Sequence, residues 1–366
     1  MKFKAVIGLM SGTSMDGIDA SLVYTNGDRL KRTSFNSITP YSDTTAALLN
    51  KAIENPLDFI NNNKKCNQLS NLITIEHSKV IQKILDESKI IPFLVGFHGQ
   101  TIYHEPSSKL SIQLGNGILL SRLIKINVVN NFRSNDIKFG GEGAPIAPIY
   151  HQKIIKYYNF KLPAVIINIG GIANLTYWDG NTLLGFDTGP GNNLMDFYMQ
   201  KQFNKSYDNF GEFAFKGNIN YELINNYSKN IFFSKKPPKS LERKYLFNNI
   251  YLENIYSLNK YDCMATLCTL TSVTIKKSID LLPQNPKTII IVGGGQHNKY
   301  LIKLIKESST FSSVHTGNEV GLPSDFIEAE LIALLSIRKY YNLPSTYPST
   351  TGVKKDTILG DLIKHK

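Results

Sequence analysis

The sequence lacks a long hydrophobic run. No stretch of about 18 consecutive apolar residues occurs in the 366 residues, so we expect neither a transmembrane helix nor a membrane partner. The opening MKFKAVIGLM places lysines before a short apolar run, as a secretory signal does, but the polar SGTSMDG interrupts it at once. We therefore expect a cytoplasmic protein.

Cysteine is scarce. The chain has three, Cys66, Cys263 and Cys268, an odd number in scattered positions. This pattern excludes a disulfide framework, and no cysteine or histidine spacing is typical of a zinc site. We expect three buried free thiols.

Acidic residues are fewer than basic ones. The chain has 41 lysines and arginines against 29 acidic residues, a net charge of +12. Such an excess suits nucleic acid or an anionic substrate. The lysines are spread along the chain, however, and the densest cluster, KKPPKSLERK at 235–244, lacks the interleaved aromatic side chains of a strand-binding groove. We therefore expect no nucleic-acid partner.

The chain has no short repeat of solenoid period, but one pattern of predicted elements occurs twice. The start reads as strand, glycine turn and strand, and 163–178 (PAVIINIGGIANLTYW) repeats that pattern. Helical spacing is seen at 44–60, 71–88 and 324–341. We predict an α/β fold of two halves with a cleft between them, and domains 1–138 plus 345–366 and 139–344.

The turn SGTSMDG, residues 11–17, has the composition of a phosphate-binding loop. Glycines let backbone N–H groups approach a phosphate closely, and hydroxyls add further donors. The loop lacks the Walker spacing, so an ordinary hairpin turn is the alternative. The second glycine turn, Gly170–Gly171, favours the functional interpretation because two such hairpins could grip a triphosphate.

Three glycines, Gly293, Gly294 and Gly295, follow a buried strand in IIIVGGGQHN. Ligands of α/β sheets bind beyond the carboxyl ends of strands, and glycines leave room for a base or ribose. A tight strand-to-helix turn is the alternative.

The stretch GFDTGPGNN places Asp187 between a strand and a helix that starts near Asn192. A carboxylate beside such glycines is accessible to substrate, so Asp187 is the candidate general base. A turn-capping aspartate is the alternative.

Two further segments carry candidate substrate contacts. His98 lies in FHGQTIYHEP, where we expect an apolar strand to end in a glycine-rich corner at 96–99. The alternative for this residue is a hydrogen-bonded core histidine. Arg133 and Asp136 precede the glycine-rich FGGEGAP, which suggests a hinge or lid, with a surface ion pair as the alternative.

Taken in order, GLMSGTSMDGIDA, FHGQTIYHEP, NIGGIANLTY, GFDTGPGNNLMD, PPKS, ATLCTLTSVTI, VGGGQHN and GLPSDFIEAE resemble the anhydro-N-acetylmuramic acid kinases of bacterial cell-wall recycling. The resemblance implies a two-domain actin-like (ribonuclease H-like) ATPase fold. It implies ATP with Mg²⁺, an anhydro-amino sugar as substrate, and Asp187 as the catalytic aspartate. Glu328 would contact the sugar. The ATP phosphate loop would comprise Gly12, Thr13, Ser14, Met15, Asp16, Gly17, Ile18 and Asp19.

Other points follow from the same resemblance. Arg133 could pair with the lactyl carboxylate of the substrate, and Asp16 is a candidate Mg²⁺ ligand. Asn116, Asn131 and Glu142 depart from the family's pattern on the substrate side. The oligomeric state is left open, with a homodimer as one alternative. The rival functions are a sugar kinase that acts on a free hydroxyl and an actin-like nucleotide-binding scaffold.

Overall fold

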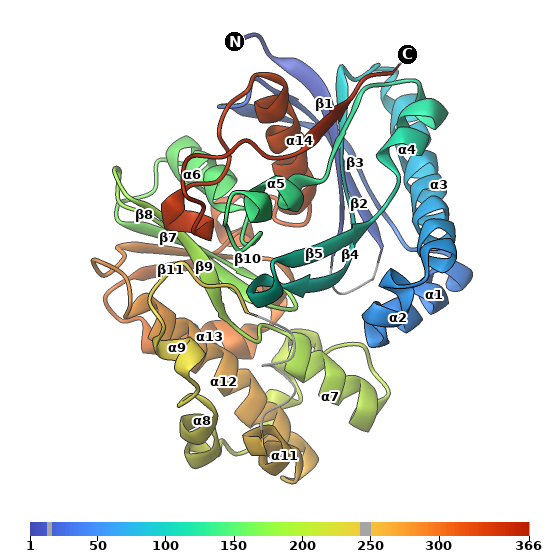
Figure 1. The fold of residues 1–366 in the computed structure, drawn as a ribbon. Helices are drawn as coiled ribbons and strands as arrows, with labels where there is room; N and C mark the ends of the chain where they lie inside the picture. Colours follow the sequence, from blue (N-terminus) through green and yellow to red (C-terminus); the bar gives the residue numbers. More distant parts are fainter. Residues whose placement is uncertain (13–16, 242–249, 366) are drawn as a thin grey trace. The chain divides into compact units, whose positions relative to one another are not determined.

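The computed structural model describes residues 1–12, 17–241 and 250–365, and the chain forms two compact units (Figure 1). The N-terminal unit comprises Met1–Lys153, Phe326–Pro348 and Gly352–Lys366; the C-terminal unit comprises Ile154–Asp325 and Ser349–Thr351. These boundaries differ from the predicted domains at 139–153, 326–344 and 349–351. The long helix near the end of the chain belongs to the N-terminal unit, because it packs on that unit's sheet.

The N-terminal unit is built on one mixed sheet. The strand order is β12-β6-β4-β1-β2-β3, with β5 paired to β4. The strands are β1 (Lys4–Ser11), β2 (Ile18–Thr25), β3 (Leu30–Thr39), β4 (Leu94–Glu105), β5 (Leu110–Leu114), β6 (Val128–Asn130) and β12 (Asp361–Ile363). Strand β12, near the end of the chain, pairs antiparallel with β6 and so joins the N-terminal sheet.

Helices cover both faces of this sheet. Because side chains alternate along a strand, Ile7 and Leu9 of β1 join the core with the helix over Asn63–Ser88, while Gly8 faces the helix over Ile327–Tyr340. The helices are α1 (Asp43–Glu54), α2 (Pro56–Ile60), α3 (Asn63–Ser88), α4 (Gly117–Ile124), α5 (Phe132–Lys138) and α14 (Ile327–Tyr340). Helix α6 (Pro148–Tyr157) spans the boundary between the units.

The C-terminal unit has a second sheet, of order β11-β10-β7-β8-β9. Its strands are β7 (Ala164–Ile169), β8 (Ala173–Trp178), β9 (Leu183–Gly189), β10 (Thr288–Val292) and β11 (Ser313–Thr316). Its helices are α7 (Asn193–Phe203), α8 (Tyr221–Tyr227), α9 (Ile231–Ser234), α11 (Ile250–Tyr256), α12 (Lys260–Ile279), α13 (Lys299–Ser308) and the short α15 (Pro348–Thr351) at the boundary. Helix α12 contacts β9, α7, α8, α11 and α13, and it is buried along most of its length.

The two sheets are built alike. In each, a hairpin of two antiparallel strands is followed by a third antiparallel strand, and two parallel strands extend the other edge. The glycine turns 12–17 and 170–172 therefore occupy the same position in the two sheets. The predicted α/β class, with two halves each opened by a glycine hairpin, is confirmed.

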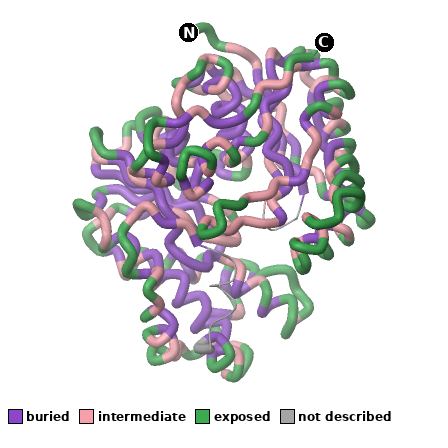
Figure 2. The backbone as a smooth tube through the Cα atoms, viewed as in Figure 1, coloured by how far each residue is buried: buried purple, intermediate pink, exposed green. Residues whose placement is uncertain are grey.

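Each unit has its own hydrophobic core. Figure 2 shows buried residues along the strands of both sheets and along α12. All three cysteines are free thiols; Cys263 and Cys268 are buried as predicted, whereas Cys66 is only half-buried. Within the described parts of the chain, no helix is long and apolar enough to cross a membrane.

Two predicted elements differ in detail. The segment 44–60 forms two helices, because Asn55 precedes Pro56 and a residue before proline is disfavoured in helical conformation. The predicted glycine corner at 96–99 is instead the interior of β4, which continues to Glu105 and pairs with β5 beyond Gly99.

Candidate active site

The predicted phosphate loop connects β1 to β2 in the N-terminal unit. Gly12 follows β1 directly, and Gly17 immediately precedes β2, where Ile18 and Asp19 begin the antiparallel pairing. Ile18 is fully buried, so its side chain belongs to the core. The other four predicted loop residues, Thr13, Ser14, Met15 and Asp16, lie outside the described residues.

Buried side chains hold the start of this loop. His77 Nδ1 lies 2.8 Å from the Ile73 carbonyl, which can only accept, so Nδ1 carries the proton and Nε2 accepts. Ser11 Oγ lies 3.0 Å from that Nε2, and the Tyr41 hydroxyl donates to Ser11 Oγ at 2.8 Å. Gln100 Nε2 donates to the Gly12 carbonyl at 2.9 Å. Burial lowers the pKa of His77 to about 4, so this histidine is neutral near pH 7.

The structure brings His98 and Arg133 together. His98 Nδ1 donates to the Gly99 carbonyl at 2.8 Å, so its Nε2 accepts the Arg133 Nε–H at 3.1 Å. Burial, and to a smaller extent the nearby Arg133 charge, lower the pKa of His98 to about 3. Arg133 Nη1 also donates to the Gly143 carbonyl at 2.9 Å. A neutral histidine thus fixes the direction of the guanidinium.

Asp136 is fully buried and accepts the Gly143 N–H at 2.7 Å. Because Asp136 is buried, an ion pair at the surface is not what holds this side chain. Both Arg133 and Asp136 bind the backbone of Gly143, at the end of the glycine-rich stretch that was predicted as a hinge or lid.

Two glutamates begin α14. Glu328, the predicted sugar contact, is half-buried in the first helical turn. Glu330 is buried, and Arg32 binds it through two hydrogen bonds of 2.7 and 2.9 Å. The Tyr150 hydroxyl also donates to Glu330. These contacts fasten α14 to β3 and α6.

In the C-terminal unit the other predicted glycines converge. The Gly170 and Gly171 carbonyls accept the backbone N–H groups of Asn192 and Asn193 at 2.9 and 3.1 Å, at the start of α7. The corner Gly293–Gly295 lies against the end of β7, where Gly293 has φ +79° and a Cβ there would lie 2.3 Å from Asn168 Oδ1. Three backbone segments therefore meet at one end of this sheet.

Asp187 lies at the same end of that sheet. It belongs to β9, opposite Asn174 of β8, and one pair of the register, Ala173 with Gly189, separates it from the β7–β8 turn. Its side chain is 6% exposed. Its Oδ2 accepts two hydrogen bonds, from Ser240 Oγ at 3.0 Å and from the Leu241 N–H at 2.8 Å. Asp187 is thus a buried, hydrogen-bonded carboxylate within a strand. The sequence had predicted it in the loop after the strand.

Two of the departures from the family pattern have local structural roles. Asn116 caps α4, with its Oδ1 accepting the Leu119 N–H at 3.0 Å, and an aspartate could do the same. Asn131 has φ +55° and donates to Asp361 Oδ2 at 3.1 Å. An aspartate at 131 would repel Asp361, so asparagine suits this chain.

Sequence reasoning missed several of these residues. Ser240 was seen only as part of the PPKS block, and no spacing connects it to Asp187. His77 and Tyr41 gave no signal, since a lone histidine or tyrosine on an apolar helix or loop is typical of a core. Glu330 was overlooked beside Glu328, although two glutamates stand in EAE.

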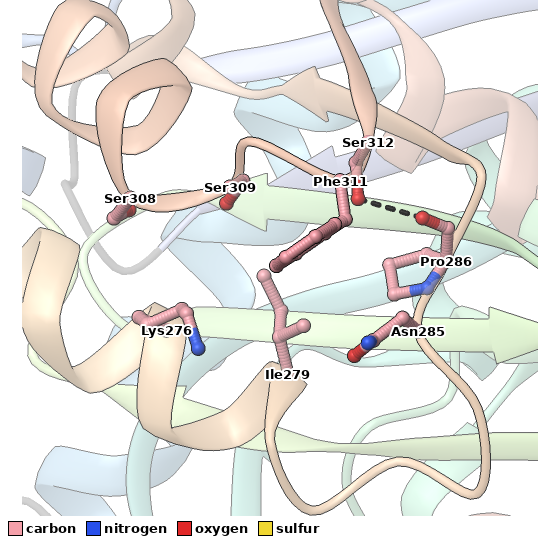
Figure 3. Close-up of a pocket in the computed structure, with 8 residues that line it drawn as sticks. All are labelled: Lys276, Ile279, Asn285, Pro286, Ser308, Ser309, Phe311 and Ser312. Atoms are coloured by element: carbon pink, nitrogen blue, oxygen red, sulfur yellow. Dashed lines mark hydrogen bonds between the residues drawn. The ribbon is translucent and has the colours of Figure 1, made fainter.

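A small hollow in the C-terminal unit does not coincide with the site. It has a volume of about 30 Å³, room for about one water molecule, and Phe311 and Ile279 face each other across it (Figure 3). None of the nominated residues that the structure describes lines it. Among residues 1–12, 17–241 and 250–365, no group of three or more histidine, cysteine or acidic side chains could hold a metal ion.

Comparison with known proteins matches the whole chain to one family. The family described as anhydro-N-acetylmuramic acid kinase matches residues 4–365. A protein of that name from Zymomonas mobilis is 37% identical over 358 residues, covering 95% of this chain and 96% of its own. Others from Bradyrhizobium diazoefficiens and Hydrogenovibrio crunogenus are 35% and 36% identical; they cover 95% and 98% of this chain, and 95% and 97% of their own lengths.

Proposed function

Because this chain belongs to the anhydro-N-acetylmuramic acid kinase family, a family of kinases, we propose that it uses ATP to convert 1,6-anhydro-N-acetylmuramic acid into N-acetylmuramic acid 6-phosphate. The reaction opens the anhydro ring with water and serves cell-wall recycling in the cytoplasm, where ATP is made. The observation that carries the proposal is the buried Asp187, whose Oδ2 accepts two hydrogen bonds, at the same end of its sheet as Gly170–Gly171 and Gly293–Gly295.

The substrate dictates the need for a base. Its 6-oxygen is bound to its own anomeric carbon, so there is no free hydroxyl at position 6 to phosphorylate. Asp187 takes a proton from water as that water adds to the anomeric carbon. The bond from this carbon to O6 breaks, O6 bonds to the γ-phosphorus, and the bond from that phosphorus to ADP breaks. One water and one ATP are consumed, and ADP and the 6-phosphate leave.

Aspartate suits this role because it is ionised at neutral pH and compact. A positioned general base contributes typically ~10²–10⁴-fold. Backbone groups of three glycine segments would bind the nucleotide: Gly12–Gly17, Gly170–Gly171 and Gly293–Gly295. Such contacts would align the γ-phosphate with the attacking oxygen and neutralise part of the phosphate charge. Mg²⁺ would arrive with the nucleotide, since it is commonly held by one or two carboxylates and phosphates, and would neutralise phosphate charge.

The test is a product analysis in ¹⁸O-labelled water. The protein is incubated with ATP and the anhydro sugar, and the product is identified by mass and fragmentation. The label should appear on the anomeric hydroxyl and not in the phosphate. A parallel incubation with N-acetylmuramic acid distinguishes the rival kinase, which would phosphorylate that free hydroxyl without incorporating label.

Asp187→Asn is expected to fold, to bind ATP and to lose turnover by at least roughly 10²-fold, because only the base is removed. The matched control is Asp179→Asn, a half-buried turn position where the amide oxygen can still accept the Asn181 and Thr182 N–H groups. Near-normal turnover of the Asp187 variant would remove Asp187 from this role.

A further inference from the structure

Asp187 is hydrogen-bonded through both its backbone and its side chain to one short segment, Lys239–Leu241. The Asp187 N–H donates to the Lys239 carbonyl at 3.0 Å. In return, the Leu241 N–H and the Ser240 hydroxyl donate to Asp187 Oδ2 at 2.8 and 3.0 Å. The segment thus pairs with β9 at this residue and extends the pairing onto the carboxylate.

Two donors on one oxygen restrict rotation of the carboxylate. The terminal torsion of an aspartate is otherwise broad, with no sharp minimum to fix the plane of its oxygens. Hydrogen bonds to an ionised acceptor are roughly twice as strong as those between neutral groups. The Leu241 N–H belongs to the backbone, so Ser240 supplies the side-chain part of this orientation.

Lys239 keeps the segment in place. Its side chain is almost fully buried, and its ammonium group donates to the Phe232 carbonyl at 2.9 Å. The same group lies 4.6 Å from the centre of the Phe232 ring and 5.6 Å from that of Phe186, the residue before Asp187. The ammonium therefore anchors the segment to α9 and β9, and the Ser240 hydroxyl has a defined position.

We propose that Ser240 is a positioning residue for the reaction: its hydroxyl, with the Leu241 N–H, fixes the Asp187 carboxylate in the orientation that receives the proton of the attacking water. This inference rests on the proposed role of Asp187 as the base. Ser240 acts through that carboxylate and does not itself touch the reacting atoms.

A double-mutant cycle tests the inference, since an effect exerted through Asp187 must vanish when Asp187 can no longer act. Ser240→Ala is expected to lower kcat about 10- to 100-fold, the range for a misplaced catalytic group. KM for ATP and for the anhydro sugar should change by less than about twofold, because ground-state binding is retained. Ser240→Thr, which keeps the hydroxyl, should recover most of kcat.

In the Asp187→Asn background, Ser240→Ala should cause no further loss of kcat. The matched control is Ser234→Ala, an exposed serine nearby whose hydroxyl donates only to the Ile231 carbonyl at 3.1 Å; it should turn over like the unmodified protein. An unchanged kcat in Ser240→Ala, no recovery in Ser240→Thr, or an equal loss in both backgrounds would overturn the inference. A fully active Asp187→Asn would instead overturn the proposed function, so the two failures are distinct.

Discussion

Two hydrogen bonds orient the Arg133 guanidinium. His98 accepts its Nε–H and the Gly143 carbonyl accepts from Nη1, so the plane of the guanidinium is set by two neighbours of fixed position. A planar guanidinium can bind a carboxylate through two parallel hydrogen bonds. The lactyl arm distinguishes the muramic sugar from its glucosamine counterpart by such a carboxylate.

Arg133→Gln is accordingly expected to raise KM for anhydro-N-acetylmuramic acid about tenfold or more, because a hydrogen bond to a charged group contributes about 1.5–3 kcal/mol. KM for ATP should hardly change. Steady-state kinetics with the anhydro sugar that lacks the lactyl arm provide the comparison, since that substrate should be used equally by both proteins. Arg122→Gln, an exposed position in α4, is the control. Equal losses on both sugars would contradict a carboxylate contact.

At this scale the sequence could predict residues whose chemistry is visible in isolation. A lone aspartate among glycines indicates a base or a cap, and Asp187 stands in such a place. Ser240 could not be predicted, because the hydrogen bond to Asp187 spans 53 positions and depends on how a segment returns to the sheet. The same is true of Arg32 and Glu330, which are 298 positions apart. Pairings of this kind are created by tertiary packing and have no local periodicity.

Among the elements, α14 packs unusually close to its sheet. A Cβ placed on Gly8 of β1 would lie 1.9 Å from the Ala329 carbonyl oxygen, a backbone atom that cannot rotate away. On β4, a Cβ at Gly96 would lie 2.3 Å from Ser336 Oγ. Helix and sheet therefore meet through the two glycines, and this contact holds β1, which leads into the predicted phosphate loop.

Gly8→Ala should lower the free energy of unfolding by about 3 kcal/mol or more, since inserted core atoms force backbone shifts. Urea unfolding followed by circular dichroism measures this. Gly321→Ala is the comparison: that glycine has φ +68° but nothing lies within 4 Å of its Cβ position, so only a backbone cost of about 1 kcal/mol is expected. A Gly8 variant no less stable than the Gly321 variant would show that α14 can shift without cost.

The elements themselves were largely predictable, since strand–turn–strand units and long amphipathic helices have strong local patterns. The exceptions have physical reasons. Pro56 ends one helix and starts another within a single helical pattern. Gly96 and Gly99 read as a corner, yet β4 continues through them because its neighbours β1 and β5 supply the pairing. The sequence also could not predict which unit α14 packs on, because the apolar face of a helix does not identify the sheet that it contacts.

At the level of the molecule, buried ionisable groups differ between the units. His77, His98, His104 and His151 all lie in the N-terminal unit, and burial lowers the pKa of each, to about 4 for His77 and to about 3 for the other three. In the C-terminal unit, burial raises the pKa of Asp196 to about 7. Acid should therefore affect the two units in opposite directions.

The sign follows from proton binding. Below about pH 6.5 these histidines bind protons in the unfolded state but remain neutral in the folded state. The N-terminal unit therefore loses stability as pH falls toward 4. The shift of His77, from 6.5 to about 4, corresponds to about 3 kcal/mol when fully expressed. Folded Asp196 holds its proton up to about pH 7, whereas the unfolded aspartate releases it near 3.8, so this group stabilises the C-terminal unit as pH falls.

The single tryptophan allows this to be measured. Trp178 is a buried residue of β8, so its fluorescence reports the C-terminal unit alone, while circular dichroism reports helices of both units. On acid titration from about pH 7 to about pH 4, ellipticity should fall before the tryptophan emission shifts. His104→Gln should move the first transition to lower pH, and the exposed His297→Gln should not. Coincident transitions would contradict the difference between the units.

The discontinuity of the N-terminal unit has a consequence for biosynthesis. When residues 1–153 have emerged from the ribosome, α14 is not yet translated. The face of the N-terminal sheet that contains Gly8 and Gly96 is then uncovered. The C-terminal unit is almost entirely one continuous stretch, 154–325, so it can fold during synthesis before the N-terminal unit is complete. The N-terminal unit, whose first part is translated first, is thus completed last. It needs shielding from premature association until α14 and β12 leave the exit tunnel.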